Sequence, residues 1–190
     1  MNTVINGKKY TKKKMEKMIN NFKVFLGGTC NDSTWRDELI PKLGIDYFNP
    51  VVDDWTPECQ AEEERQKSEE CNVHLYVITP KQTGVFSAAE MIESSCNKNV
   101  ITVIYIQDED GTGFTFDESR KRSWNAVVRM AQKYGAFVLN SLDEVALYLN
   151  ETALQLNEVT LNNNNKTVTS TNIQPIRYTT TKTNEGYTYD

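Results

Sequence analysis

The chain has 190 residues, a formal net charge of −5 and 25% charged residues, which is ordinary for one soluble globular domain. Its apolar runs are shorter than the roughly 20 residues of a membrane-spanning helix, and its basic start lacks the apolar core of a signal peptide. We therefore expect a cytoplasmic protein. The four cysteines form no CxxC pair, and the single histidine, His74, lies in an expected strand. We predict reduced thiols, no metal site and no cofactor.

Charge and composition divide the chain into three parts. Residues 1–21 are rich in lysine, but they lack the interleaved aromatics of a nucleic-acid site, so we expect a solvated, partly disordered arm and no nucleic-acid partner. Residues 22–157 form the expected domain. Residues 158–190 are rich in threonine and asparagine. This tail is either disordered in the free monomer or an extended arm that docks on a partner subunit.

Apolar runs alternate along the domain with segments of helical period. The expected strands are 23–28, 45–48, 73–79, 100–106 and 137–139. The expected helices are 33–43, capped by Ser33 or Asp32, and 58–71, 85–97, 117–134 and 141–156. Helix 85–97 is expected to bury Val85, Ala88, Ala89, Ile92 and Cys96. This alternation predicts an α/β fold, a flavodoxin-like three-layer sandwich with a five-stranded parallel sheet and right-handed crossovers.

Polar and glycine-rich loops follow the first three expected strands, at 27–29, 49–55 and 79–87. The carboxyl ends of parallel strands meet at one edge of a sheet, where ligands bind. Simpler interpretations exist for each residue: turn glycines, solvated or helix-capping carboxylates, a core-edge aromatic and a helix-surface charge. Their convergence favours one pocket, into which Glu90 projects from the second turn of a helix. The candidate groups are Gly27, Gly28, Asn49, Asp53, Asp54, Trp55 and Glu90.

The pattern FLGGT, STWR, YFNPVVDDW, LYVITP and GVFSAAE, in this order, resembles the nucleoside 2-deoxyribosyltransferase-like family over residues 22–149. The resemblance implies an enzyme that cleaves the N-glycosidic bond of a 2′-deoxynucleoside or deoxynucleotide and transfers the sugar to another base or to water. It implies Glu90 as the nucleophile, since a carboxylate can trap an oxocarbenium-like centre covalently. Family members often complete their site from a neighbouring subunit, which implies a homo-oligomer.

The resemblance also implies roles for residues around Glu90. Asp54 matches a polar residue that contacts the base, and Asn72 matches a carboxylate position behind the site. The expected substrate-binding residues are Gly27, Gly28, Thr29, Asn49, Trp55, Asn72, Gly84 and Ser87.

The chain departs from the family pattern at two points. No acid precedes the turn at Gly84, and Asn72 stands where an aspartate is usual. Asp53 or Asp54 is then the candidate for the missing acid. Two alternatives stay open: a catalytically silent nucleotide-binding module, and a hydrolase of another N-riboside such as NAD.

Overall fold

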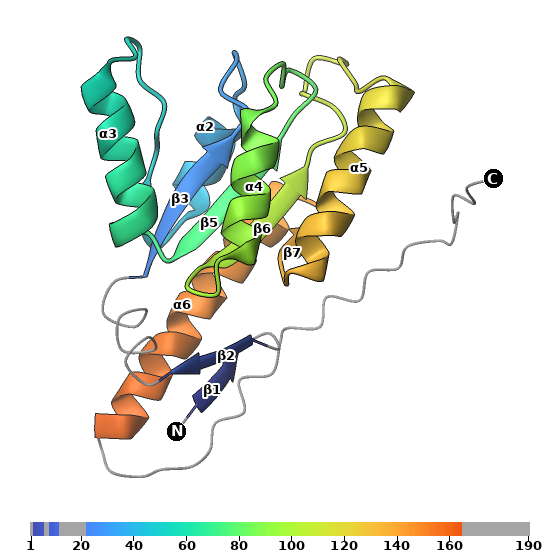
Figure 1. Cartoon of the computed structure of the whole chain (residues 1–190). Coiled ribbons are helices and arrows are strands. Elements are labelled where there is room, and N and C mark those ends of the chain that lie inside the picture. The colour runs from blue at the N-terminus through green and yellow to red at the C-terminus, as the bar shows by residue number, and fades with distance from the viewer. Residues whose placement is uncertain (1, 6–7, 12–21, 165–190) are drawn as a thin grey trace, which may run out of the picture.

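The computed structural model describes residues 2–5, 8–11 and 22–164. Its centre is an all-parallel sheet with strand order β4-β3-β5-β6-β7, which is the flavodoxin-like topology predicted from the sequence. Helices cover both faces, so the expected three layers are present (Figure 1). The strands are β3 (Lys23–Gly28), β4 (Asp46–Phe48), β5 (Val73–Ile78), β6 (Ile101–Ile106) and β7 (Phe137–Leu139).

The connections between the strands are helical. No helix in the described ranges has the length and apolar character needed to cross a membrane. The helical elements are α2 (Trp35–Leu39), the 3₁₀ turn η1 (Ile40–Lys42), α3 (Pro57–Arg65), the π-helical turn η2 (Gln66–Glu70), α4 (Phe86–Cys96), α5 (Glu118–Lys133) and α6 (Leu142–Asn164).

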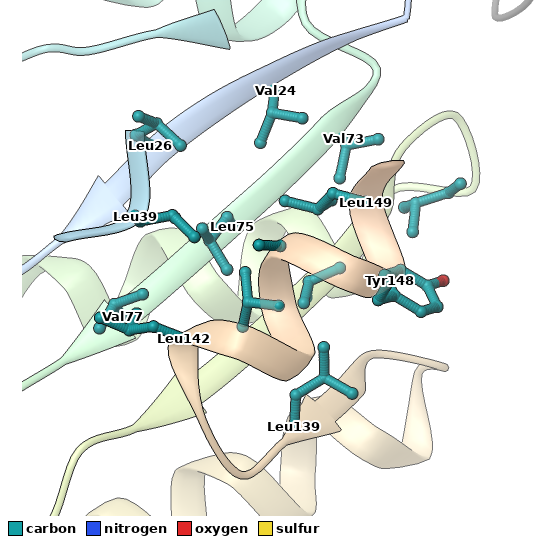
Figure 2. Close-up of a cluster of buried hydrophobic side chains, with 14 of the residues drawn as sticks. Val24, Leu26, Leu39, Val73, Leu75, Val77, Leu139, Leu142, Tyr148 and Leu149 are labelled. Atoms are coloured by element: carbon teal, nitrogen blue, oxygen red, sulfur yellow. The ribbon is translucent and has the colours of Figure 1, made fainter. Parts of the chain in front are cut away.

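Two apolar clusters hold the layers together. All six residues of β5 are buried, as expected for a central strand covered on both faces. Alternate side chains such as Val24, Leu26 and Leu75 meet α2 and α6 on one face (Figure 2). Phe25 and Tyr76 point to the other face, where α4 and α5 pack. Each fully buried aliphatic side chain contributes about 1.5–3 kcal/mol relative to exposure.

The buried face of α4 differs from the prediction. The expected inner residues Val85, Ala89 and Cys96 are exposed, and the buried residues are Ser87, Met91, Ser94 and Ser95. Small hydroxyl side chains let the helix lie close to the sheet, provided that their polar atoms find partners. The Ser95 hydroxyl donates to the Met91 carbonyl oxygen at 2.6 Å, for example. The prediction was wrong because serine does not register as a core residue in an apolar pattern.

The ends of the elements differ in smaller ways. Helix α2 begins after Thr34 without a side-chain cap, so the predicted cap at Ser33 or Asp32 was wrong. Helix α6 continues to Asn164, beyond the expected Leu156 and into the predicted tail. In the predicted basic arm, β1 (Asn2–Ile5) and β2 (Lys8–Thr11) pair as an antiparallel hairpin. The remainder of the arm and residues 165–190 of the tail lie outside the described residues.

Candidate active site

A cavity of about 1150 Å³ lies between α3–η2 and α4, with His74 of β5 at its floor. In Figure 1, α3 lies to the left of β3 and α4 lies in front of the sheet. The cavity exists because α3 buries none of its residues, so this helix does not close down on the sheet. Thr56 caps α3 by accepting a hydrogen bond from the Cys59 amide at 3.3 Å, and Pro57 starts its first turn. Local capping thus stabilises α3 without burial of its side chains, and α3 forms one wall of the cavity.

Glu90 projects into this cavity from the second turn of α4. Its Oε1 lies 2.8 Å from Nζ of Lys67, and the two side chains are only 12% and 14% exposed. Lys67 also lies 3.4 Å from Oε2 of Glu93, whose side chain is largely exposed. Glu90 is therefore not a free surface charge. It is a shielded carboxylate held in one orientation by a lysine from the opposite wall.

Glu63 adds a second carboxyl group to the same cavity. Burial raises the pKa of Glu63, and the nearby negative charge of Glu90 raises this pKa further, against the opposing effect of Lys67. Glu63 therefore holds a proton to higher pH than an ordinary glutamate does. The site combines a carboxylate paired with a lysine and a second carboxyl group whose pKa is raised above that of an ordinary glutamate.

The floor of the cavity is a buried polar network. His74 Nδ1 lies 2.8 Å from the Ser94 hydroxyl, and His74 Nε2 lies 2.9 Å from the Lys67 carbonyl oxygen. The Tyr76 hydroxyl lies 2.8 Å from the same Ser94 hydroxyl. Burial lowers the pKa of His74 to about 4, so the imidazole is neutral near pH 7. Burial likewise raises the pKa of Tyr76.

Residues 21–108 match the family model described as nucleoside 2-deoxyribosyltransferase like. Residues 21–108 thus form a nucleoside 2-deoxyribosyltransferase-like domain. The match runs from just before β3 through β6, and it includes Glu63, Lys67 and Glu90. No curated protein matches the chain.

Within the deoxyribosyltransferase-like domain, the loop after β3 is tied to neighbouring elements by buried hydrogen bonds. The Thr29 hydroxyl accepts a hydrogen bond from the Thr79 amide at 2.9 Å. The Thr29 carbonyl oxygen accepts from Trp35 Nε1 at 2.9 Å and from the Arg36 guanidinium at 2.7 Å. Arg36 also donates twice to the Leu26 carbonyl oxygen and is 4% exposed. The polar groups of Thr29 and Arg36 are thereby engaged inside the protein.

The loop after β5 is fastened to its surroundings. Asn31 donates to the Thr83 hydroxyl at 2.7 Å, and Lys81 donates to the Asp32 carbonyl oxygen at 2.8 Å. Arg120 of α5 donates to the carbonyl oxygens of Pro80 and Gln82. The loops after β3 and β5 thus meet at the carboxyl edge, and they brace the turn that leads into α4.

Of the ten other predicted site residues, one lines the cavity and nine do not. Trp55 lines it together with Glu90, and both Trp55 and Phe86 are more than half exposed at its rim. Asn72 lies at the amino end of β5, where its Oδ1 accepts from the Lys23 amide at 3.3 Å. The remaining predicted residues are not among those that line the cavity: Gly27, Gly28, Thr29, Asn49, Asp53, Asp54, Gly84 and Ser87.

Four of these eight residues differ in burial. Asn49, Asp53 and Asp54 are exposed, and Asn49 Oδ1 accepts from the Val51 amide at 3.2 Å, which shapes its own loop. Ser87 is a buried residue of the first turn of α4.

Sequence reasoning did not single out Glu63 and Lys67. One signal for them was available: the two residues are four apart in an expected helix, a spacing that puts them on one face. Nothing in the sequence showed that this face would meet Glu90.

Proposed function

We propose that this protein cleaves or exchanges the N-glycosidic bond of a 2′-deoxynucleoside, with Glu90 as the nucleophile. The observation that carries the proposal is the Glu90 carboxylate, shielded in a cavity and oriented by Lys67, within a deoxyribosyltransferase-like domain. A Glu90 oxygen attacks C1′ of the sugar, the bond from C1′ to the base nitrogen breaks, and its electron pair leaves with the base. The second step reverses the first, when an acceptor base or water attacks C1′ and releases Glu90.

Glu63 supplies the proton that the leaving base needs. Burial and the nearby charge of Glu90 raise the pKa of Glu63, which suits Glu63 to donate a proton while Glu90 acts as the nucleophile. Exposed Trp55 and Phe86 at the rim provide aromatic surfaces on which a base can stack. Glu63 can also supply the acid that is missing before Gly84. The interpretation as a catalytically silent binding module depended on that missing acid, so we favour the enzyme.

The proposed function is tested by product analysis. The protein is incubated with each common 2′-deoxynucleoside, with and without a second free base, and with NAD. We expect release of the free base, formation of a new deoxynucleoside when an acceptor is present, and a deoxyribosyl adduct on Glu90 by mass spectrometry. Tight binding without base release would contradict the proposal. Release of nicotinamide alone would instead assign the NAD reaction.

Replacing Glu63 by Gln is expected to slow base release by on the order of 10²-fold or more, the usual contribution of a general acid. The loss should shrink with 7-methyl-2′-deoxyguanosine, whose cationic base departs without being protonated. Single-turnover rates for both substrates measure the difference. Glu64→Gln is the matched control, because Glu64 neighbours Glu63, lines the same cavity and is exposed. Equal losses with both substrates would exclude proton donation by Glu63.

The charge of the cavity favours a substrate without phosphate. Even with Glu63 protonated, the described lining residues include four carboxylates and only two cations, Arg65 and Lys67; the carboxylates are Glu64, Glu69, Glu90 and Glu93. Arg65 is paired with Glu62 and Glu70, and Lys67 with Glu90. A 5′-phosphate would therefore enter a negative field in which the cations are already engaged.

We expect kcat/KM for a deoxynucleoside to exceed that for its 5′-monophosphate by about tenfold, which corresponds to about 1.4 kcal/mol. Because the repulsion is electrostatic, the ratio should fall as salt is raised from 0.02 to about 0.5 M. Paired assays with deoxyadenosine and its monophosphate measure this ratio. A preference for the monophosphate would mean that a phosphate is held elsewhere, for instance at the open start of α4.

A further inference from the structure

The hydrogen-bond directions in the floor of the cavity follow from chemistry. The Lys67 carbonyl oxygen is only an acceptor, so His74 Nε2 carries the hydrogen and donates to it. Nδ1 of the neutral ring is then an acceptor, and the Ser94 hydroxyl donates to it. The Ser94 oxygen in turn accepts from the Tyr76 hydroxyl. One chain of donors thus runs from Tyr76 through Ser94 and His74 to the backbone of Lys67.

Lys67 needs this support because it lies in the π-helical turn η2. Its carbonyl oxygen would accept from the amide four residues further on in an α-helix, or five residues further on in a π-helix. Those amides donate elsewhere: Cys71 to the Gln66 carbonyl oxygen at 2.8 Å, and Asn72 to the Lys23 carbonyl oxygen at 3.1 Å. The ring of His74 takes their place, and it fixes the residue whose ammonium group contacts Glu90.

We propose that His74 is a positioning residue, which holds the backbone of Lys67 so that the Lys67 ammonium group stays against the Glu90 carboxylate. Its catalytic consequence rests on the function proposed above, whereas its structural part does not. His74 does not reach the reacting atoms itself. It acts through Lys67, and Ser94 acts one step behind it by holding the ring in the tautomer that donates from Nε2.

The first test reads the tautomer directly and needs no turnover. His74 is the single histidine of the chain, so the ¹⁵N signals of its ring are unambiguous in a long-range proton–nitrogen spectrum. We expect the neutral Nε2–H tautomer at pH 7, with protonation only near pH 4. An Nδ1–H tautomer, or a charged ring at pH 7, would overturn the proposal whatever the enzyme does.

The second test follows Lys67, again without turnover. Brief labelling with acetic anhydride, quantified by mass spectrometry, reports how freely each lysine side chain reacts. His74→Leu removes the donor to the Lys67 carbonyl oxygen, so we expect Lys67 to label several-fold faster than in the native protein. His74→Gln retains an N–H donor at about the position of Nε2 and should restore slow labelling. Equal labelling in all three proteins would remove the link between His74 and Lys67.

The third test connects the link to catalysis. We expect His74→Leu to lower kcat by about tenfold or more while KM changes little, and His74→Gln to recover most of the rate, since misplaced catalytic groups cost rate more than binding. Thermal unfolding of the same samples separates a lost fold from a lost orientation. Ser94→Ala serves if His74→Leu does not fold, and its loss should be smaller. Unchanged kcat in a folded His74→Leu variant that labels fast at Lys67 would refute the catalytic part alone.

Discussion

Replacing Glu90 by Gln is expected to lower the rate of deoxyribosyl transfer by on the order of 10³-fold or more, because an amide oxygen cannot form the covalent glycosyl–enzyme. The side chain keeps its size, and its carbonyl oxygen can still accept from Lys67. The expected defect therefore lies in kcat, with the fold and substrate binding retained. Stopped assays with product chromatography measure the rate, and calorimetry with a deoxynucleoside measures binding.

Glu93→Gln provides the matched control for Glu90→Gln. Glu93 lies one turn further along α4, lines the same cavity and also contacts Lys67, but its side chain is 76% exposed. We expect its rate to stay within about threefold of the native value, as for most surface substitutions. If Glu90→Gln remained as active as Glu93→Gln, another residue would have to be the nucleophile.

Gly28→Ala is expected to destabilise the fold by more than about 3 kcal/mol, through strain at a special backbone conformation together with a backbone clash. Gly28 has φ +116°, and a Cβ built there would lie 2.0 Å from the Val77 carbonyl oxygen of β5. That oxygen accepts from the Thr29 amide at 2.9 Å, so it cannot move without opening the pairing of the two strands. Denaturant-induced unfolding measures the loss.

Gly84→Ala is the control for this substitution. The nearest atom to a Cβ at Gly84 is Nε2 of Gln82 at 3.8 Å, which is ordinary contact. The free energy of unfolding should change by no more than about 0.5 kcal/mol. Similar losses of unfolding free energy in the two variants would mean that the backbone conformation of Gly28 does not stabilise the contact between β3 and β5.

The sheet could be predicted because its strands are short apolar runs bounded by turn residues. All five expected strands lie within one residue of those observed, and the β-branched run of β6 indicated burial on both faces. The sequence also predicted that Glu90 lies in the second turn of a helix, where the structure has it. These features depend on local pattern, which a single sequence carries.

The placement of Glu63 and Lys67 opposite Glu90 could not be predicted, because it depends on the π-helical turn and on contacts between distant residues. The π-helical turn adds one residue to the helix and alters the direction of Lys67, and no local signal marks such a turn. The contact between Lys67 and Glu90 joins residues 23 positions apart. The pKa of Glu63 depends first on its burial and then on the charges of Glu90 and Lys67, which also come from outside its own helical turn. The three groups become a site only when α3 and α4 face each other.

The absence of buried side chains in α3 has a consequence for how the protein moves. Moving this helix away from the sheet would expose little additional apolar surface to water. We therefore expect its opening to cost far less free energy than global unfolding. The attachment is polar and concentrated at the carboxyl end, where the Lys23 ammonium group contacts Gln66 Oε1 at 2.8 Å and His74 holds Lys67. We therefore expect amide exchange in α3 to be faster than in α4. Opening of α3 would widen the cavity for the base of the proposed substrate, while Lys67, which His74 holds at the carboxyl end, would stay against Glu90.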